Sequence, residues 1–469
     1  MLSAASVASS IKDAIFSPTV FSRNASTSFI VRKNIGIFGR MNAGKSTLMN
    51  NFTQQQTSIV DDTPGTTADV KQALIEFHKM GPVKLFDTAG LDENGPLGDK
   101  KRWKTESALL QSDLCILVVH VDACVSARDC STELDVLSQA KARNKPALVI
   151  FNVREGGMQP PADLVATLKQ AYPALNDVAI DLHSANAGQK LIHHIEETYN
   201  LGMKQVSLLP DVPNSDRRGA VFLNIPMDAE TPGCRLLRPQ AFTQEQALSK
   251  YLSTVCYRMD LGQARGPTSS DEQERFYQAL NTASNLRLLV TDSQAMDVVY
   301  PWTKGMDLPM TTFSTAMINF MSGGRLPELI AGLEALHHLK PGDKVLICEA
   351  CNHDRLTENC EDIGLTQLPR IIKRMATELS GVPGEAITIE HSFGRVFPRD
   401  DVRDYALVVH CGACMLDQQA TVARLDALAE SGVPVTNYGL LLSYAQKPDA
   451  LKRVIAPYGL DLDKLVLGR

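Results

Sequence analysis

The sequence predicts an α/β protein with mostly parallel sheets, divided into about three domains. Three observations support this prediction. The chain is 469 residues long, and a domain usually takes about 100–200 residues. Short apolar runs, typical of buried strands, alternate with segments of helical length. A polar, proline-containing stretch at residues 209–218 interrupts this alternation and is predicted to be a linker.

The composition is that of an ordinary globular protein, with 44% hydrophobic and 21% charged residues. The net charge of −6 argues against a nucleic-acid partner, because proteins that bind nucleic acid usually carry a basic excess. No run approaches the roughly 20 apolar residues of a membrane-spanning helix, so no membrane partner is expected. The 10 cysteines are scattered, which favours reduced thiols and metal ligands over a disulfide framework.

Residues 1–30 differ from the rest of the chain. They are rich in Ser and Ala, contain Lys12 and Arg23, and have Asp13 as their single acidic residue. Ser-rich, acid-poor leaders of this kind are typical of mitochondrial-type transit peptides. The sequence therefore predicts import into an organelle, with a disordered N-terminal tail as the alternative.

Residues 31–200 show the alternating pattern first. Strands are predicted at 34–39, 83–90, 114–122, 147–152 and 178–185, and helices at 45–53 and 131–143. Between the first strand and the first helix lies the sequence GRMNAGKS, from Gly39 to Ser46. This is a complete phosphate-binding loop, whose glycines let backbone N–H groups face the phosphates. Lys45 is expected to contact the β- and γ-phosphates, and Ser46 to contact Mg²⁺.

Further motifs follow in the order expected of a nucleotide switch. Thr66 and Thr67 lie where a switch loop would bring a Thr to the metal and γ-phosphate. Asp87 would hold the magnesium shell, and the N–H of Gly90 would sense the γ-phosphate. Ser184-Ala185 follows the last strand and could contact the base. Together these motifs resemble the small GTPases of the translation-factor class.

Two positions depart from that class. The guanine-binding motif Asn-Lys-x-Asp is replaced by Asn152-Val153-Arg154-Glu155, and Glu155 is one methylene longer than Asp. Leu91 stands where Ras-like proteins have a water-orienting Gln, so slow hydrolysis or another water-positioning group is expected. GTPases similar to this one use an Asn at the position of Asn42 to help bind K⁺, so potassium-stimulated hydrolysis is expected.

The predicted catalytic residues are Lys45, Asp87 and Thr67. The predicted nucleotide-binding residues are Gly39, Asn42, Ala43, Gly44, Lys45, Ser46, Thr47, Thr66, Thr67, Asp87, Gly90, Asn152, Glu155, Ser184 and Ala185.

Beyond the linker, two further α/β units are predicted. The second begins with a strand at 220–226 and includes another at 286–293, and its polar segment 262–274 is predicted to be a flexible insertion. The third begins near residue 320. Its strands are predicted at 344–350, 406–411 and 433–439, and its helices at 329–338 and 418–429.

Two cysteine motifs follow strands of the third unit. They are Cys351-Asn352-His353 and His410-Cys411-Gly412-Ala413-Cys414. Ligands bind at the carboxyl ends of parallel strands, so the two motifs should meet in one crevice. The thiolates of Cys351, Cys411 and Cys414 can hold three irons of a 4Fe–4S cluster. The fourth iron would take His353, a carboxylate such as Glu358, water or an incoming molecule.

The same residue set also suits structural zinc, and the chemistry alone favours neither metal. Cys348 is predicted to be a core residue of its strand. The other cysteines have no ligand-like spacing: Cys115, Cys124, Cys130, Cys234 and Cys256.

A GTPase domain followed by Cys-x-His and a distant His-Cys-x-x-Cys resembles the FeFe-hydrogenase maturation GTPase family, HydF. The resemblance covers nearly the whole chain after the leader, and its motifs include VTDSQA (290–295), LKPGDKVLICEAC (339–351), DIGLTQLPR (362–370), VVHCGACML (408–416) and GVPVTNYG (432–439). It implies a P-loop GTPase fold at 31–200, a smaller α/β dimerisation domain at 201–318 and an α/β iron–sulfur cluster domain at 319–469.

The resemblance also implies a function. Such a protein is a GTP-binding and GTP-hydrolysing scaffold, with Mg²⁺, that receives a di-iron subcluster bearing CO and cyanide. Two radical-SAM maturases make that unit, and the scaffold delivers it to apo FeFe-hydrogenase. Cys351, Cys411 and Cys414 match the cluster-binding positions, and His353 and His410 match the histidines of the motif. A homodimer is implied, with a hydrogenosome as the expected location and a plastid or the cytoplasm as alternatives.

Other interpretations remain open at this stage. His353 and His410 are separated by 56 residues, slightly more than is usual in the family, and a small insertion near 357–361 would account for this. The main alternative is a tRNA-modifying or ribosome-assembly GTPase with a structural zinc site. A second is a structural adaptor with vestigial nucleotide binding.

Overall fold

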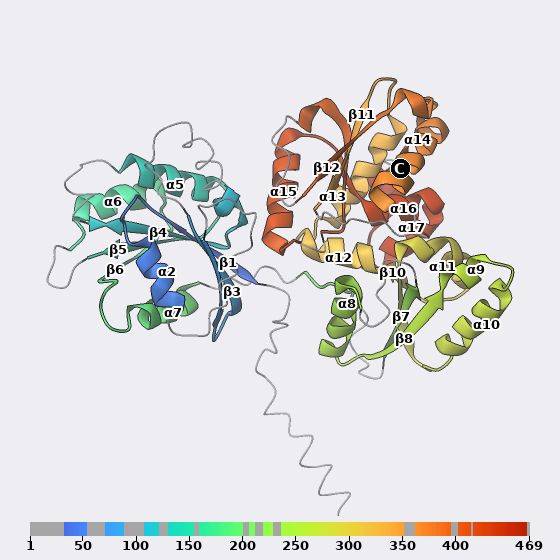
Figure 1. Ribbon diagram of the computed structural model, residues 1–469, viewed down its shortest axis with the longest axis horizontal. Helices are drawn as coiled ribbons and strands as arrows, with labels where there is room; N and C mark the ends of the chain where they lie inside the picture. The colour runs from blue at the N-terminus through green and yellow to red at the C-terminus, as the bar shows by residue number, and fades with distance from the viewer. Residues whose placement is uncertain are drawn as a thin grey trace, which may run out of the picture.

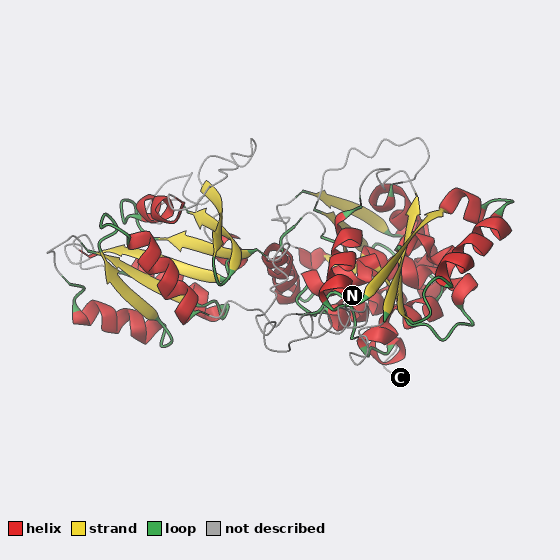
Figure 2. Ribbon diagram, turned by 90° about the horizontal axis from the view of Figure 1, so that it is seen from below, coloured by secondary structure: helices red, strands yellow, loops and turns green. Residues whose placement is uncertain are grey.

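The computed structural model describes most of the chain in three α/β units (Figure 1, Figure 2). The described residues are 32–53, 71–88, 107–121, 130–153, 159–199, 206–211, 219–227, 236–350, 362–394, 402–413 and 416–466. The predicted leader at 1–30 lies outside them. No helix among the described residues is long and apolar enough to cross a membrane.

The first unit is a six-stranded sheet in the order β2-β3-β1-β4-β5-β6. Its strands are β1 (Lys33–Phe38), β2 (Lys71–Phe77), β3 (Gly81–Asp87), β4 (Leu114–His120), β5 (Ala147–Asn152) and β6 (Asn176–Ile180). Only the edge strand β2 runs antiparallel to its neighbour. Strand β2 was not predicted, because the segment KQALIEF mixes polar with apolar residues, as an edge strand can.

Helices cover both faces of this sheet. Helices α2 (Lys45–Thr53) and α7 (Ala187–Thr198) bury Leu48, Phe52 and Leu191 against one face. Helices α5 (Ser131–Ala142) and α6 (Ala162–Ala171) bury Leu137 and Leu168 against the other. The two separate apolar clusters show a helical layer on each side of the sheet, and its mostly parallel pairing confirms the predicted α/β fold.

The second unit contains a four-stranded parallel sheet in the order β10-β9-β7-β8. Its strands are β7 (Ala220–Met227), β8 (Ser253–Asp260), β9 (Leu286–Thr291) and β10 (Met310–Thr312). The helices are α8 (Arg238–Ser249), α9 (Leu261–Arg265), α10 (Ser269–Leu280), α11 (Met296–Thr303) and α12 (Phe313–Met321). The expected boundary between the second and third units, at residue 318, lies within α12.

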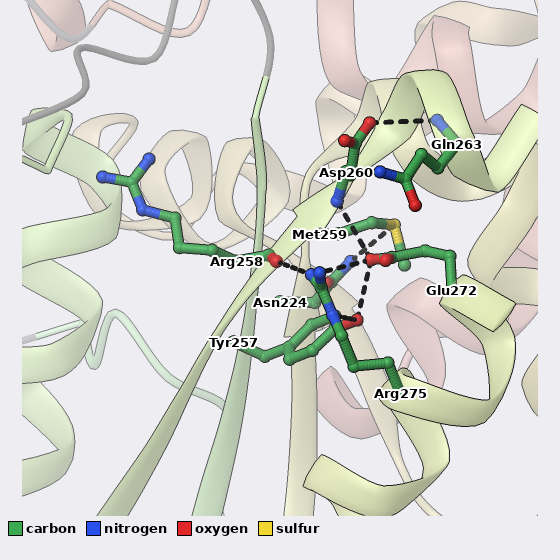
Figure 3. Close-up of polar contacts among 8 residues, drawn as sticks. All are labelled: Asn224, Tyr257, Arg258, Met259, Asp260, Gln263, Glu272 and Arg275. Atoms are coloured by element: carbon green, nitrogen blue, oxygen red, sulfur yellow. Dashed lines mark hydrogen bonds and ion pairs between the residues drawn. The ribbon is translucent and has the colours of Figure 1, made fainter.

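The prediction of a flexible insertion at 262–274 is wrong, because this segment forms most of α9 and the first half of α10. Asp260 caps α9 by accepting a hydrogen bond from the N–H of Gln263, at 2.9 Å. Glu272 of α10 is buried and accepts hydrogen bonds from the Tyr257 hydroxyl at 2.7 Å and the Asp260 N–H at 3.0 Å, and Arg275 lies 3.1 Å away (Figure 3). This buried polar network holds α10 against β8, and burial raises the pKa of Tyr257 to about 12.

The third unit has a four-stranded parallel sheet in the order β12-β11-β13-β14. Its strands are β11 (Lys344–Glu349), β12 (Thr388–Phe393), β13 (Tyr405–His410) and β14 (Val435–Asn437). Its helices include α13 (Leu326–Ala331), α14 (Leu368–Met375), α15 (Gln418–Ser431), α16 (Tyr438–Gln446), α17 (Pro448–Ile455) and α18 (Leu462–Val466).

The second and third units have the same strand order and the same register. Val221 of β7 pairs with Leu288 of β9, and Val345 of β11 pairs with Leu407 of β13. Both pairings carry an irregularity immediately before these residues. Each sheet ends in a three-residue strand, and the last residue, Thr312 or Asn437, caps the following helix. When the two registers are aligned residue by residue, Asp292, which follows β9, is equivalent to Cys411, which follows β13.

The two units also exchange helices. Helix α13, which follows α12, packs on β14 of the third unit, and α17, which follows the equivalent α16, packs on β10 of the second. Gly332 lies against the backbone of Val435, where a Cβ would come within 2.0 Å of its carbonyl oxygen. One hydrophobic cluster includes buried residues of both units. The second and third units therefore form one body.

This exchange predicts that Arg453 of α17 stabilises the second unit. Its guanidinium donates to the carbonyl oxygens of Thr303, at 2.7 Å, and Leu308, at 3.0 Å. The Arg453→Ala variant should lose about 2–3 kcal/mol of unfolding free energy, because buried acceptors lose their donors. Urea unfolding gives this loss, and hydrogen exchange should accelerate around α11. Lys452→Ala, on the solvent side, is the matched control and should leave both unchanged.

Candidate functional site

The phosphate-binding loop lies at the carboxyl end of β1, where the chain turns into α2. Gly39 and Gly44 have φ angles of +149° and +108°, which L side chains rarely adopt. A Cβ on Gly39 would also lie 2.4 Å from the carbonyl oxygen of Val118, and one on Gly44 would lie 2.7 Å from Nδ2 of Asn152. Both positions therefore require glycine, as the motif predicts.

Lys45, Ser46 and Asp87 lie together, as predicted. The Lys45 ammonium donates to the carbonyl oxygens of Gly39, at 3.0 Å, and Arg40, at 2.8 Å, across the loop. The Ser46 hydroxyl donates to Oδ2 of Asp87 at 3.0 Å. A hydroxyl beside a carboxylate, next to a lysine held over the loop, is the donor set that Mg²⁺ and a nucleotide phosphate require.

Asn152 joins the phosphate-binding loop to the expected base-binding segment. Its Nδ2 donates to the carbonyl oxygen of Ala43 at 3.1 Å, and its Oδ1 accepts from the N–H of Leu182 at 3.4 Å. Ser184 and Ala185 follow in the turn before α7, and the Ser184 hydroxyl donates to the carbonyl oxygen of Asp181. The remaining predicted nucleotide contacts, Thr66, Thr67, Gly90 and Glu155, lie outside the described residues.

One contact at this loop was not predicted. Arg40 is held by Glu133, at the start of α5, with Nε–Oε1 at 2.8 Å and Nη2–Oε2 at 3.0 Å. The Glu133 side chain is only 2% exposed. Two parallel charge-assisted hydrogen bonds fix the orientation of the Arg40 guanidinium, and thus of the loop, more tightly than a single bond would. No local pattern identifies Glu133, because the two residues are 93 positions apart.

Asn42 takes a left-handed conformation, with φ at +60°, at the tip of the loop. Asn tolerates this conformation better than most residues do. Its expected role in binding K⁺ stays a prediction.

The second predicted site lies where β11 and β13 end. The two strands are neighbours, and Cys348 pairs with His410. The N–H of Cys411 donates to the carbonyl oxygen of Cys348 at 3.0 Å, and the N–H of Ala350 donates to Sγ of Cys411 at 3.4 Å. The strands that precede the two cysteine motifs are thus neighbours. The expected meeting of the motifs in one crevice stays a prediction, because Cys351, His353, Glu358 and Cys414 lie outside the described residues.

Cys411 differs from the other buried cysteines. Burial alone would raise the pKa of its thiol, but contact with His410 and N–H donation from Ala350 and Ala413 outweigh burial and lower it. Burial raises the pKa of Cys348 to about 12. Cys348 thus behaves as the predicted core residue, whereas Cys411 is held in surroundings that stabilise a thiolate.

His410 is fully buried, and its Nδ1 lies 2.8 Å from the carbonyl oxygen of Cys411. Because a carbonyl only accepts, Nδ1 donates in this contact. Nε2 has no hydrogen-bond partner among the described residues. A histidine ring oriented by a backbone carbonyl in this way is typical of metal ligands. The described part of the chain contains no cluster of three or more metal-ligating side chains.

Comparison with known proteins gives two family models. Residues 34–153 match the model described as 50S ribosome-binding GTPase, and residues 327–457 match that of the hydrogen maturase F tetramerization domain. The chain therefore carries a GTPase domain, which implies binding of GTP and Mg²⁺. The second match indicates oligomerisation.

Curated relatives cover the GTPase part. GTPase Der of Parvibaculum lavamentivorans is 34% identical over 176 residues, which is 33% of this chain and 36% of the relative. GTPase Der of Bartonella henselae is 26% identical over 203 residues, or 40% and 41% of the two chains. The chain thus spans well under half the length of these relatives.

Solved structures give only weak similarity. An Era variant of Aquifex aeolicus bound to GDP.AlF4- aligns with a TM-score of 0.29 and 18% identity, over 54% of this chain and 99% of that one. The G domain of the T. maritima FeoB iron transporter gives 0.25 and 19%, over 35% and 98%.

The contact between Arg40 and Glu133 predicts a role in nucleotide affinity. The Glu133→Gln variant should bind GTP about tenfold more weakly, because the neutral amide cannot hold the loop arginine by two charge-assisted bonds. Titration with a fluorescent GTP analogue measures this. Asp135→Asn, on the exposed face of the same helix, is the control. Equal affinities of Glu133→Gln and the unmodified protein would contradict a positioning role for Glu133.

Proposed function

Because the chain belongs to the hydrogen maturase F family, with a GTPase domain followed by that family's tetramerization domain, we propose that it is a GTP-hydrolysing scaffold for the assembly of FeFe-hydrogenase. In this proposal it carries a 4Fe–4S cluster, receives a di-iron subcluster as cargo, and delivers it to the apo-enzyme. Two radical-SAM maturases supply the cargo. We also propose that the protein works in an organelle of mitochondrial type.

The nucleotide half of the proposal is supported by Lys45, Ser46 and Asp87, which meet at the carboxyl edge of the first sheet. Lys45 would bind the β- and γ-phosphates, and Ser46 and Asp87 would hold Mg²⁺. Asn152 fixes the loop to the segment that carries Ser184 and Ala185, where the base would bind.

The cluster half depends on one observation, the N–H of Ala350 directed at Sγ of Cys411. Ala350 immediately precedes Cys351, and Cys411 opens the other motif, so the two ligand segments start within a hydrogen bond of each other. N–H donation to a ligating sulfur is typical of iron–sulfur proteins and stabilises the bound thiolate. This contact supports the proposal that Cys411 holds a cluster together with Cys351 and Cys414.

Such a cluster would supply an iron with an exchangeable coordination position, to which the cargo can attach. The protein's own contribution is to hold the sulfurs and exclude water. Cys411 is 7% exposed, and Asn437 donates to the carbonyl oxygens of His410 and Cys411, at 3.0 and 3.1 Å. These bonds fix the backbone on which the ligand stands. His410 is a candidate for the remaining coordination position.

The nucleotide site and the proposed cluster site lie at different sheets, so a single substitution should impair one and spare the other. The Lys45→Ala variant should lose GTP binding and mature hydrogenase poorly, yet keep its cluster. Iron content, visible absorption and a maturation assay measure the three properties. Loss of the cluster in Lys45→Ala would contradict the separation.

The converse variant tests the cluster directly. Cys411→Ser should retain GTP turnover and lose most of its iron and visible absorption after anaerobic purification, because a hydroxyl is a far weaker iron ligand. Cys348→Ala is the matched control on the neighbouring strand and should keep its iron. If Cys411→Ser held as much iron as the unmodified protein, the assigned cluster position would be wrong.

A further inference from the structure

The segment immediately after the second cysteine motif, Leu416 to Gln419, contacts all three units. It opens helix α15, whose N-cap residue Asp417 accepts a hydrogen bond from the N–H of Ala420 at 2.8 Å. We call residues 416–419 the joint. In Figure 1, α15 lies on the side of the third unit that faces β1 and β3 of the first.

The first unit reaches the joint from the amino ends of its strands. The Gln419 side chain donates to Oδ1 of Asp113, which precedes β4, and lies 3.5 Å from the ammonium of Lys145, which precedes β5. Lys84 of β3 forms an ion pair with Asp417 at 3.8 Å. Lys84 and Asp417 are each only about a quarter exposed or less, at 20% and 25%.

Asp113 is bound on its other side to the strand that leads to the phosphate-binding loop. Its Oδ2 accepts from the N–H of Asn34, at the start of β1, at 2.7 Å. β1 ends at Phe38, and the phosphate-binding loop begins at Gly39, five residues after Asn34. Lys84 similarly stands three residues before Asp87 on β3. The joint is therefore linked to β3 through Lys84 and to β1 through Asp113, and the carboxyl ends of both strands lead to nucleotide-binding residues.

The second unit and α12 hold the joint from the opposite side. The Arg238 guanidinium, at the start of α8, donates to the carbonyl oxygen of Leu416 at 3.0 Å. The buried Gln418 side chain donates to the carbonyl oxygen of Phe320 at 2.6 Å. The joint is thus fixed to the body formed by the second and third units, while Asp417 and Gln419 present polar groups to the first unit.

We propose that this joint is the intramolecular docking surface through which the nucleotide state of the first unit sets the position of the Cys411 segment, with Lys84, Asp113 and Gln419 as positioning residues. The inference deepens the proposed function and rests on it only for the identity of the metal bound near Cys411. Strands are stiff, so a displacement at the phosphate end of β1 or β3 reaches the joint at the other end. The loop from Cys411 is tied directly to α15 by the N–H of Leu416, which donates to the carbonyl oxygen of Ala413 at 3.0 Å.

Hydrogen exchange of the full chain, read by mass spectrometry, tests this proposal without any metal. In the unmodified protein, a non-hydrolysable GTP analogue should change exchange of the amides at 416–425. In Lys84→Glu, which sets two carboxylates against each other, exchange there should be about tenfold faster and should no longer respond to the analogue. The double variant Lys84→Glu/Asp417→Asn should recover protection, because Asn also caps helices well.

The controls separate docking from general damage. Asp177→Asn removes a surface partner of Lys169 in the first unit and should leave exchange at 416–425 unchanged. If Lys84→Glu unfolds the first unit, Gln419→Ala removes the contact from the other side and decides the question. Exchange at 416–425 that is the same in Lys84→Glu, Gln419→Ala and the unmodified protein would overturn the proposal. Iron content is measured separately, so failure of the cluster assignment would not be confused with failure of the joint.

Discussion

The pairing of β13 with β11 is the constraint on which the second site depends. Two motifs separated by 56 residues can act together only if their strands lie side by side and end at the same edge. In the parallel order β12-β11-β13-β14, the strand order reverses between the neighbouring strands β11 and β13. Ligands bind at such topological switch points. The N–H of Ala350 at Sγ of Cys411 is the direct consequence.

The second unit shows what the fold contributes without a cysteine at the equivalent strand end. It repeats the topology and register of the third unit, yet has Asp292 where the third has Cys411. Asp292 caps a short helix by accepting from the N–H of Gln294 at 3.0 Å. The same scaffold therefore serves structure in one copy and carries a proposed cluster ligand in the other, so that function would depend on the residues placed at the strand ends. The exchanged helices α13 and α17 hold the two copies together.

Local patterns in the sequence predicted the phosphate-binding loop, the helix at 45–53 and the strands that carry both sites, because each depends on a short run of residues. Contacts distant in sequence were not predictable in this way. Glu133 reaches Arg40 from another helix, and Gln419 reaches Asp113 across 306 positions. The prediction of an insertion at 262–274 was wrong because it relied on the polar composition of the segment. It overlooked the helix cap at Asp260 and the buried, helically spaced Phe276 and Leu280.

The most direct test of the proposed cluster is metal analysis with EPR spectroscopy of the unmodified protein, purified without oxygen. We expect about four irons per chain and, after reduction, the EPR signal of a 4Fe–4S cluster. One zinc per chain with no iron would contradict it, and the cysteines at the ends of β11 and β13 would then form a structural zinc site beside a nucleotide switch.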